Sequence, residues 1–137
     1  MPREVLTVQK VLVIGGSGGI GAAVARQIVA AAGQVFLAGR NTEKLSATAA
    51  ELGANWTAVE ATDAASVDAC ADAATEALGG LTGITNCVGS ILLKPAHLTQ
   101  PEDWQATLAA NLTTAFNTVR TAGRLLKASG GSVVLLS

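Results

Sequence analysis

The chain has 137 residues, of which half are hydrophobic and 14% are charged, and its formal net charge is -1. This length and apolar content are enough for one domain with its own core, so we expect residues 1–137 to form a single domain. The balanced charge argues against nucleic acid as a partner, and no apolar run approaches the roughly 18 residues needed to cross a membrane.

A glycine-rich stretch separates the first two predicted elements. Residues 10–14 are an apolar, β-branched run typical of a strand buried on both faces. Residues 22–32 then have helical periodicity, with one face formed by Ile20, Val24, Ile28 and Ala31. Between these elements, a G-x-x-x-G-x-G spacing is formed by Gly15, Gly19 and Gly21, and a G-x-G-x-x-G spacing by Gly16, Gly18 and Gly21.

Such a turn suits a diphosphate. The first amides of a helix lack internal partners and bind anions, and glycines let phosphates approach the backbone. We predict that Gly15 makes the tight turn, that Gly19 admits the pyrophosphate, and that Gly21 lets the helix pack closely on the sheet. The alternative is a glycine-rich turn that binds nothing.

The second predicted strand, residues 34–38, begins after Gly33, which we expect to end the first helix, and it leads into Gly39 and Arg40. Dinucleotide-binding folds place an acidic residue near this point for the ribose of NAD, whereas an arginine accommodates the 2′-phosphate of NADP. Because an arginine and no acid is present, we predict that Arg40 faces a 2′-phosphate. An ordinary solvated arginine is the alternative.

The middle of the chain continues to alternate. A helix is predicted at residues 43–52, capped by Asn41 or Thr42, and a strand at residues 56–60. The next helix, residues 63–78, is capped by Asp63, and its inward face is formed by Val67, Ala71, Ala74 and Leu78.

A further strand at residues 81–85 leads into Asn86-Cys87-Val88-Gly89. The loop at residues 90–98 contains the single histidine, His97, which we expect at the surface.

A capping box at Thr99-Gln100-Pro101-Glu102 predicts a long helix over residues 101–128. Its apolar side is formed by Trp104, Leu108, Leu112, Phe116, Val119, Leu125 and Leu126. Asparagine is a mediocre helix former, so we expect Asn111, in the middle of this helix, to face the sheet and to have a task. A solvated Asn111 is the alternative. A last strand is predicted at residues 132–136.

This alternation predicts an α/β fold, a Rossmann-like doubly wound parallel sheet in three layers with right-handed crossovers, incomplete at the C-terminus. Cys70 and Cys87 are too far apart for a local metal pair and too few for a disulfide framework, so we expect buried free thiols and no metal site. Residues 1–8 have no secretory pattern, and we therefore expect a cytoplasmic protein.

Over residues 10–137 the chain resembles the amino-terminal half of a short-chain dehydrogenase/reductase. The family's Thr-Gly-x-x-x-Gly-x-Gly loop matches residues 14–21, with Ile14 in place of the threonine. Its Asn-Asn-Ala-Gly motif is matched in part by residues 86–89, and its helical catalytic asparagine falls on Asn111. Glu60 and Thr82 stand where the family usually has aspartate.

The resemblance implies a Rossmann domain that binds NADP(H). The residues implied around the phosphates are Gly15, Ser17, Gly19, Ile20 and Gly21. Arg40, with Ser17, would hold the 2′-phosphate. Glu60 and Ala61 would border the adenine, and Asn86 and Gly89 would lie along the nicotinamide ribose.

The family's reaction is hydride transfer between nicotinamide and a small-molecule carbonyl or alcohol, with a tyrosine as proton donor assisted by a lysine, a serine and an asparagine. Asn111 would be the catalytic asparagine, and Ser137 falls near the family's serine. The Tyr-x-x-x-Lys pair is absent because the chain has no tyrosine. We therefore expect these residues to bind the cofactor without turning over a substrate.

Three explanations remain open. The sequence is part of a longer NADP-dependent reductase, or it is a complete noncatalytic protein that binds or senses NADP(H). Methyltransferases and flavin-binding Rossmann domains form the third class, which Gly39 and Arg40 disfavour. The resemblance also implies a homo-oligomer, a dimer or tetramer, formed through the long helix.

Overall fold

The computed structural model describes residues 8–136 and contains a five-stranded parallel sheet in the order β3-β2-β1-β4-β5. The strands are β1 (Lys10–Ile14), β2 (Gln34–Gly39), β3 (Asn55–Ala58), β4 (Gly83–Asn86) and β5 (Ser132–Leu135). Each neighbouring pair is parallel, so every connection crosses over the sheet. The predicted doubly wound α/β fold is confirmed.

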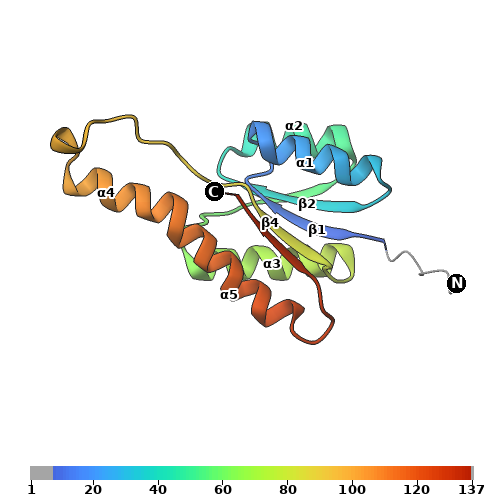
Figure 1. Cartoon of the computed structure of the whole chain (residues 1–137). Helices are drawn as coiled ribbons and strands as arrows, with labels where there is room; N and C mark the ends of the chain where they lie inside the picture. Colours follow the sequence, from blue (N-terminus) through green and yellow to red (C-terminus); the bar gives the residue numbers. More distant parts are fainter. Residues whose placement is uncertain (1–7, 137) are drawn as a thin grey trace, which may run out of the picture.

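Helices lie on both faces of the sheet (Figure 1). One face is covered by α1 (Gly19–Ala30) and α2 (Thr42–Leu52), and the other by α3 (Ala64–Leu78) and α5 (Thr114–Leu126). Before α5, the chain leaves β4, forms a short turn at Ala96–Leu98 and enters α4 (Pro101–Leu108), which projects beyond the sheet. Across residues 8–136, no helix has the length and hydropathy needed to span a bilayer.

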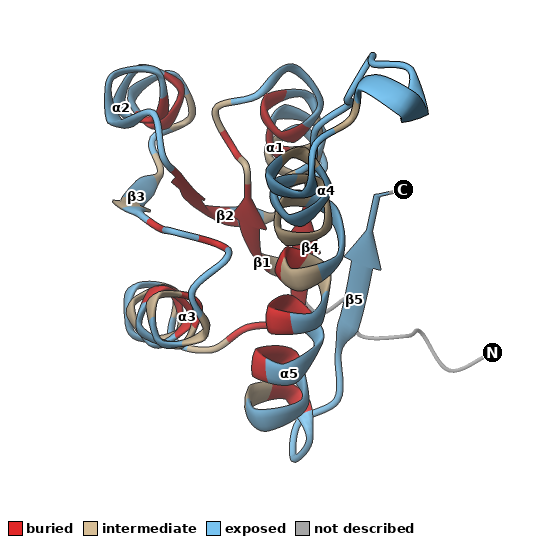
Figure 2. Ribbon diagram, turned by 90° about the vertical axis from the view of Figure 1, so that its left-hand side faces the viewer, coloured by how far each residue is buried: buried red, intermediate tan, exposed pale blue. Residues whose placement is uncertain are grey.

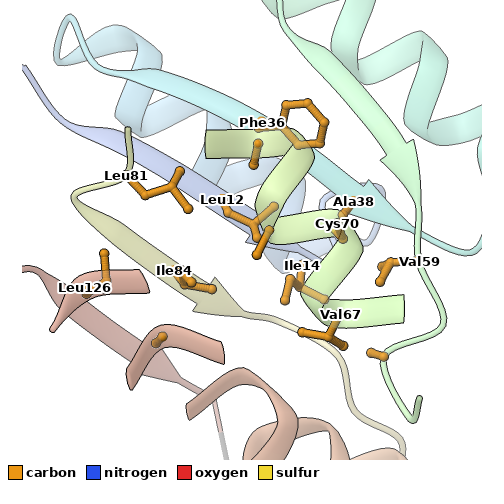
Figure 3. Close-up of a cluster of buried hydrophobic side chains, with 14 residues drawn as sticks. Leu12, Ile14, Phe36, Ala38, Val59, Val67, Cys70, Leu81, Ile84 and Leu126 are labelled. Carbon is orange, nitrogen blue, oxygen red and sulfur yellow. The ribbon is translucent and has the colours of Figure 1, made fainter. Parts of the chain in front are cut away.

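The core has two parts because side chains alternate across each strand. Leu12 and Ile14 of β1 point toward α3 and α5, where they pack with Ile84, Val67 and Leu126 (Figure 3). On the opposite face, a second cluster beneath α1 and α2 contains Val11, Val13, Val35, Leu37, Ala25, Leu45 and Ala49. The central strand is therefore buried on both faces, as predicted.

The packing face of α1 differs from the prediction. The helix begins at Gly19 instead of residue 22 and ends at Ala30, and its buried residues are Gly21, Ala22 and Ala25. Ile20, assigned to the apolar face, is 61% exposed. The glycine turn holds the start of α1 so close to β1 that only small side chains fit between them.

The end of α1 also departs from the prediction, because Ala32 and not Gly33 adopts the left-handed conformation, with φ of 65°. The Gly33 amide donates to the Ile28 carbonyl at 2.8 Å and the Ala32 amide to the Val29 carbonyl at 2.9 Å, which is the Schellman arrangement. Position 33 has no room for a larger residue than glycine, because a Cβ there would lie 2.6 Å from Cγ2 of Ile28.

Ala32→Gly is therefore expected to stabilise the protein by about 0.5–1 kcal/mol, raising Tm by roughly 2–5 °C. The relief of left-handed strain exceeds the entropy that glycine adds to the unfolded chain. Thermal unfolding measures the change. Gly53 ends α2 in the same way, with φ of 62°, so Gly53→Ala should lower Tm. A lower Tm for Ala32→Gly would contradict this explanation.

The other helix caps are mostly as predicted. Asn41 caps α2 by accepting from the Lys44 amide at 3.0 Å, and Asp63 caps α3 by accepting from the Ala65 amide at 3.0 Å. The capping box of α4 lies one residue later than predicted, at Gln100 and Asp103. The reason is that the Thr99 hydroxyl, expected to cap, donates to the Pro95 carbonyl at 3.0 Å.

The predicted long helix is interrupted, since a π-helical turn, Ala109–Thr113, separates α4 from α5. The apolar side predicted for it is buried only in part. Leu126 is 8% exposed, whereas Trp104, Leu112, Phe116 and Val119 are 49–63% exposed. The buried side of α5 carries Thr114, Asn117, Thr118, Thr121, Ala122 and Leu126.

Hydrogen bonds explain how this polar side can be buried. Thr118 donates to the Thr114 carbonyl at 2.8 Å within its own helix, and Thr121 donates to Oδ1 of Asp68 on α3 at 2.7 Å. Asn117 donates to the Ala61 carbonyl at 2.9 Å. Each buried polar group therefore has a partner, and the apolar side is left toward solvent.

Two strands shift by one or two residues from their predicted positions. β3 occupies residues 55–58 instead of 56–60, and β4 occupies 83–86 instead of 81–85. β5 forms where predicted but is not buried, because it is an edge strand whose residues are all exposed (Figure 2).

Candidate functional site

A cavity of about 280 Å³ opens at the carboxyl ends of the strands, the end that faces the viewer in Figure 2. The strands β2 and β3 are added on one side of β1, and β4 and β5 on the other, so the strand order switches between β1 and β4. Ligands of doubly wound sheets bind at such a switch point. The cavity is lined by Gly15, Ser17, Gly18, Gly39, Arg40, Asn41, Val59, Glu60, Ala61, Thr62, Cys87, Val88, Gly89, Ala110 and Thr114.

The turn after β1 is built on Gly15. This residue has φ of 85°, and a Cβ on it would lie 3.0 Å from the carbonyl carbon of Cys87. The amides of Gly15 and Gly16 both donate to the Ala38 carbonyl, at 2.7 and 3.1 Å, which ties the turn to β2. Gly15 therefore has the backbone role predicted for it.

The start of α1 offers free amides to an anion. The Ala22 amide donates to the Gly18 carbonyl at 2.9 Å, so the amides of Gly19, Ile20 and Gly21 precede the first hydrogen-bonded turn. The first turn of the helix carries no acidic side chain. A Cβ on Gly19 would meet no atom within 4 Å, whereas one on Gly21 would overlap the Gly15 carbonyl oxygen. These three residues border the cavity without lining it.

Arg40 lies exposed at the end of β2. Within residues 8–136, no carboxylate lies within 4.0 Å of its guanidinium. Ser17 lies close to Gly39, the residue before Arg40, because a Cβ built on Gly39 would be 3.5 Å from the Ser17 Oγ. Ser17 and Arg40 therefore both line the cavity near the phosphate turn.

Glu60 and Ala61 form another part of the cavity wall. The Glu60 carboxylate accepts a hydrogen bond from the Thr62 hydroxyl at 2.8 Å. The backbone amide of Glu60 donates to Oγ of Ser66 at 2.9 Å. Glu60 is exposed and Ala61 is 5% exposed. Both residues predicted to border the adenine therefore line the cavity.

Asn86 is 3% exposed and its side chain is fully used inside the protein. Its Oδ1 accepts from the Val88 amide at 2.9 Å, and its Nδ2 donates to Oγ1 of Thr114 at 3.4 Å. It therefore shapes the turn that leads to Gly89 and does not line the cavity. Gly89 does line it, and a Cβ there would lie 3.0 Å from Oδ1 of Asn111.

Asn111 does not face the sheet, contrary to the prediction. Its Oδ1 accepts from the Ser90 amide, and its Nδ2 donates to the Ser90 and Thr107 carbonyls, each at 3.0 Å. The π-helical turn adds a residue to the helical repeat and so changes which side Asn111 occupies. The side chain clamps the start of the 90–98 loop to the helix.

Some lining residues were missed by the sequence prediction. Thr114 and Ala110 are two of them, on the same helical segment as Asn111. Thr114 is three residues after Asn111, and this helical spacing was the available signal that it lies near the site. Ser137, matched to the family's serine, lies outside the described residues. Among the described residues, no group of three or more potential metal ligands comes together.

The two cysteines are free, as predicted, but only one is fully buried. Cys70 is 2% exposed, and burial raises its pKa to about 12. Cys87 is half-buried against the cavity, and burial raises its pKa as well.

Brief treatment with N-ethylmaleimide at pH 8 is expected to label Cys87 well before Cys70, because only Cys87 is accessible and its pKa is less strongly raised. The labelling rate should keep rising above the ordinary thiol pKa, since deprotonation occurs at a higher pH. Peptide mass spectrometry identifies the labelled residue. Earlier labelling of Cys70 would contradict the described burial.

The glycine turn at the switch point of a doubly wound parallel sheet defines a dinucleotide-binding fold. The family described as short chain dehydrogenase matches residues 9–137, and the chain belongs to this family. Its proteins bind a nicotinamide cofactor, NAD or NADP.

Known proteins of this family are similar to the chain. It is 36% identical over 129 residues to a D-threitol dehydrogenase of Mycolicibacterium smegmatis, covering 90% of this chain and 50% of the relative. It is 34% identical to a tropinone reductase homolog of Arabidopsis thaliana, covering 99% of this chain and 53% of the relative.

Solved structures agree with this placement. A short-chain type dehydrogenase/reductase from Mycobacterium ulcerans is 30% identical with a TM-score of 0.89, covering 96% of this chain and 52% of that one. A short chain dehydrogenase from Mycobacterium smegmatis is 25% identical with a TM-score of 0.90, covering 96% of this chain and 57% of that one. The chain thus spans about half the length of the curated relatives it matches.

Proposed function

We propose that these residues form the NADP(H)-binding part of an oxidoreductase that transfers a hydride between nicotinamide and a carbonyl or alcohol carbon of a small molecule. The observation that carries the proposal is the exposed Arg40, which lines the cavity together with Ser17, with Gly39 where an acidic residue would bind the ribose of NAD. The free thiols are consistent with a proposed cytoplasmic location.

The residues present fit this cofactor. The amides at the start of α1 would hold the diphosphate, and the open space at Gly19 gives it access. Arg40 and Ser17 would bind the 2′-phosphate, while Glu60 and Ala61 would border the adenine. Gly89 would lie along the nicotinamide ribose, in a turn that Asn86 supports. When bound, the cofactor supplies the hydride.

Proton transfer is the part of the reaction that these residues do not complete. A proton must move as the hydride moves, and the chain has no tyrosine to donate it in the way the family resemblance implies. Asn111 would support a water relay near the substrate. A noncatalytic protein that binds or senses NADP(H) is the second candidate.

Calorimetric titration tests the cofactor assignment, with NADPH, NADH, S-adenosylmethionine and FAD in parallel. We expect NADPH to bind about ten- to a hundredfold more tightly than NADH, from one charge-assisted phosphate contact. Absence of heat with NADPH on the folded protein would overturn the proposal. NADPH oxidation in the presence of carbonyl compounds, measured on the full-length native protein that carries these residues, separates the enzyme from the sensor.

We also propose self-association through the apolar side of α4 and α5, formed by Trp104, Leu112, Phe116 and Val119. Several large exposed apolar side chains along one pair of helices are typical of an interaction surface, and most soluble oligomers are symmetric homo-oligomers. In sedimentation velocity, Phe116→Asp should shift the protein to monomer, whereas Lys127→Glu at the end of α5 should not. A monomeric unsubstituted protein would overturn the proposal.

A further inference from the structure

The loop after β3 forms one wall of the cavity, yet it follows an edge strand. β3 pairs only with β2, and most of its residues are exposed. The loop is held from one side by the Val59 amide, which donates to the Gly39 carbonyl at 3.0 Å. It is also held by the Glu60 amide, which donates to Oγ of Ser66 on α3 at 2.9 Å. Neither contact fixes its distance from the opposite wall.

The opposite wall is connected to this loop by Asn117 of α5. Asn117 is 3% exposed, and its Nδ2 donates to the Ala61 carbonyl at 2.9 Å. Among the described residues, this is the one side-chain hydrogen bond that joins the loop to α5. One turn earlier on the same helix, Thr114 lines the cavity from the other side. The bond therefore ties the two walls together, in addition to the packing of Val59 and Ala61 in the core.

The other buried polar side chains of α5 do not have this effect. Thr118 donates to a carbonyl of its own helix, and Thr121 donates to Asp68 on α3, away from the cavity. Asn117 itself does not line the cavity, so it acts on a ligand only through Ala61. Ala61 is 5% exposed, and its carbonyl would be left without a donor in a poorly solvated place if Asn117 were lost.

We propose that Asn117 is a positioning residue for the adenosine end of the cofactor, an inference that rests on the proposed binding of NADP(H). The loop that it holds is joined to Gly39 by a backbone hydrogen bond, so it lies beside Arg40 and its proposed 2′-phosphate site. That phosphate is carried by the adenosine ribose, which places the adenine against Ala61. Loss of the Asn117 donor frees this wall to move away from α5.

The test uses 2′,5′-ADP, which carries only the adenosine end of the cofactor, in calorimetric titrations of the protein. Asn117→Asp keeps the size of the side chain but replaces the donor by a carboxylate facing the Ala61 carbonyl. Asn117→Ala removes the donor without adding a charge. We expect both variants to raise the Kd for 2′,5′-ADP by about tenfold or more.

Thr121→Val is the matched control, because it removes a hydrogen bond made by a buried side chain of the same helix, to Asp68 of α3, and leaves the loop untouched. It should lower Tm as Asn117→Ala does, with the Kd for 2′,5′-ADP within twofold of the unsubstituted protein. If all three variants bind equally well, the role of Asn117 is overturned. If the unsubstituted protein binds no 2′,5′-ADP, the proposed function is overturned instead.

Discussion

Gly19→Ala is expected to leave the protein folded and to raise the Kd for NADPH by about ten- to a hundredfold. A Cβ at this position meets no atom within 4 Å, so the methyl group costs little in the free protein. The same methyl group would stand where a diphosphate approaches the amides of α1. Charge-assisted hydrogen bonds to those amides are worth about 1.5–3 kcal/mol. Calorimetric titration with NADPH measures their loss.

Gly21→Ala is the contrasting variant. Its Cβ would overlap the Gly15 carbonyl oxygen, so α1 and the glycine turn could not keep their present separation. Overpacking costs about 1–3 kcal/mol even among side chains, and here the obstacle is backbone. We expect a lower Tm together with weakened binding. Gly123→Ala, in open space within α5, should leave the binding unchanged and raise Tm slightly, because alanine favours a helix interior over glycine. Unchanged NADPH affinity in Gly19→Ala would contradict the placement of the diphosphate.

The order of the elements could be predicted because its signals are local. β1 and β2 are buried on both faces, so their residues are apolar without alternation. Asn41 and Asp63 mark helix starts through hydrogen bonds that span two or three residues. Such features do not depend on the partners that an element meets later, which is why sequence pattern alone identifies them.

The packing faces of α1 and α5 could not be predicted in this way. The pattern favours burial of large apolar side chains, yet Ile20 and Phe116 are exposed, at 61% and 63%. The glycine turn brings the start of α1 close to β1, so only small residues of α1 fit between the helix and the sheet. For α5, hydrogen-bond acceptors on neighbouring segments, such as Asp68 and the Ala61 carbonyl, make a polar face suitable for packing. Both causes are tertiary and leave no periodic signal.

The cavity was predictable where residues adjoin strand ends. Gly15, Arg40 and Glu60 follow successive strands, and parallel strands bring their carboxyl ends to one edge. Asn111 was recognised by type, but its orientation was wrong, because the π-helical turn changes the register of the helix. Asn117 carries no motif at all. Its contact with Ala61 spans 56 residues and exists only once the fold brings them together.

Arg40→Ala is expected to raise the Kd for NADPH by roughly ten- to a hundredfold while leaving the Kd for NADH nearly unchanged. The exposed guanidinium has no carboxylate within 4.0 Å among the described residues, so its hydrogen-bond donors are available to a phosphate. Only NADPH carries that phosphate. Arg40→Lys keeps the charge but loses the planar fork, so its effect should be intermediate. Paired titrations with both cofactors measure the difference.

Gly39→Asp tests the proposed 2′-phosphate site by adding a negative charge beside Arg40. A Cβ there would make only ordinary contacts, 3.5 Å from Oγ of Ser17 and 3.7 Å from Cδ1 of Leu45, so an aspartate can be accommodated. Its carboxylate would repel a 2′-phosphate and accept hydrogen bonds from the free ribose hydroxyls of NADH. Combined with Arg40→Ala, it should reverse the preference toward NADH. Equal losses for the two cofactors in Arg40→Ala would instead remove this residue from the phosphate site, because a contact with the 2′-phosphate can act on NADPH alone.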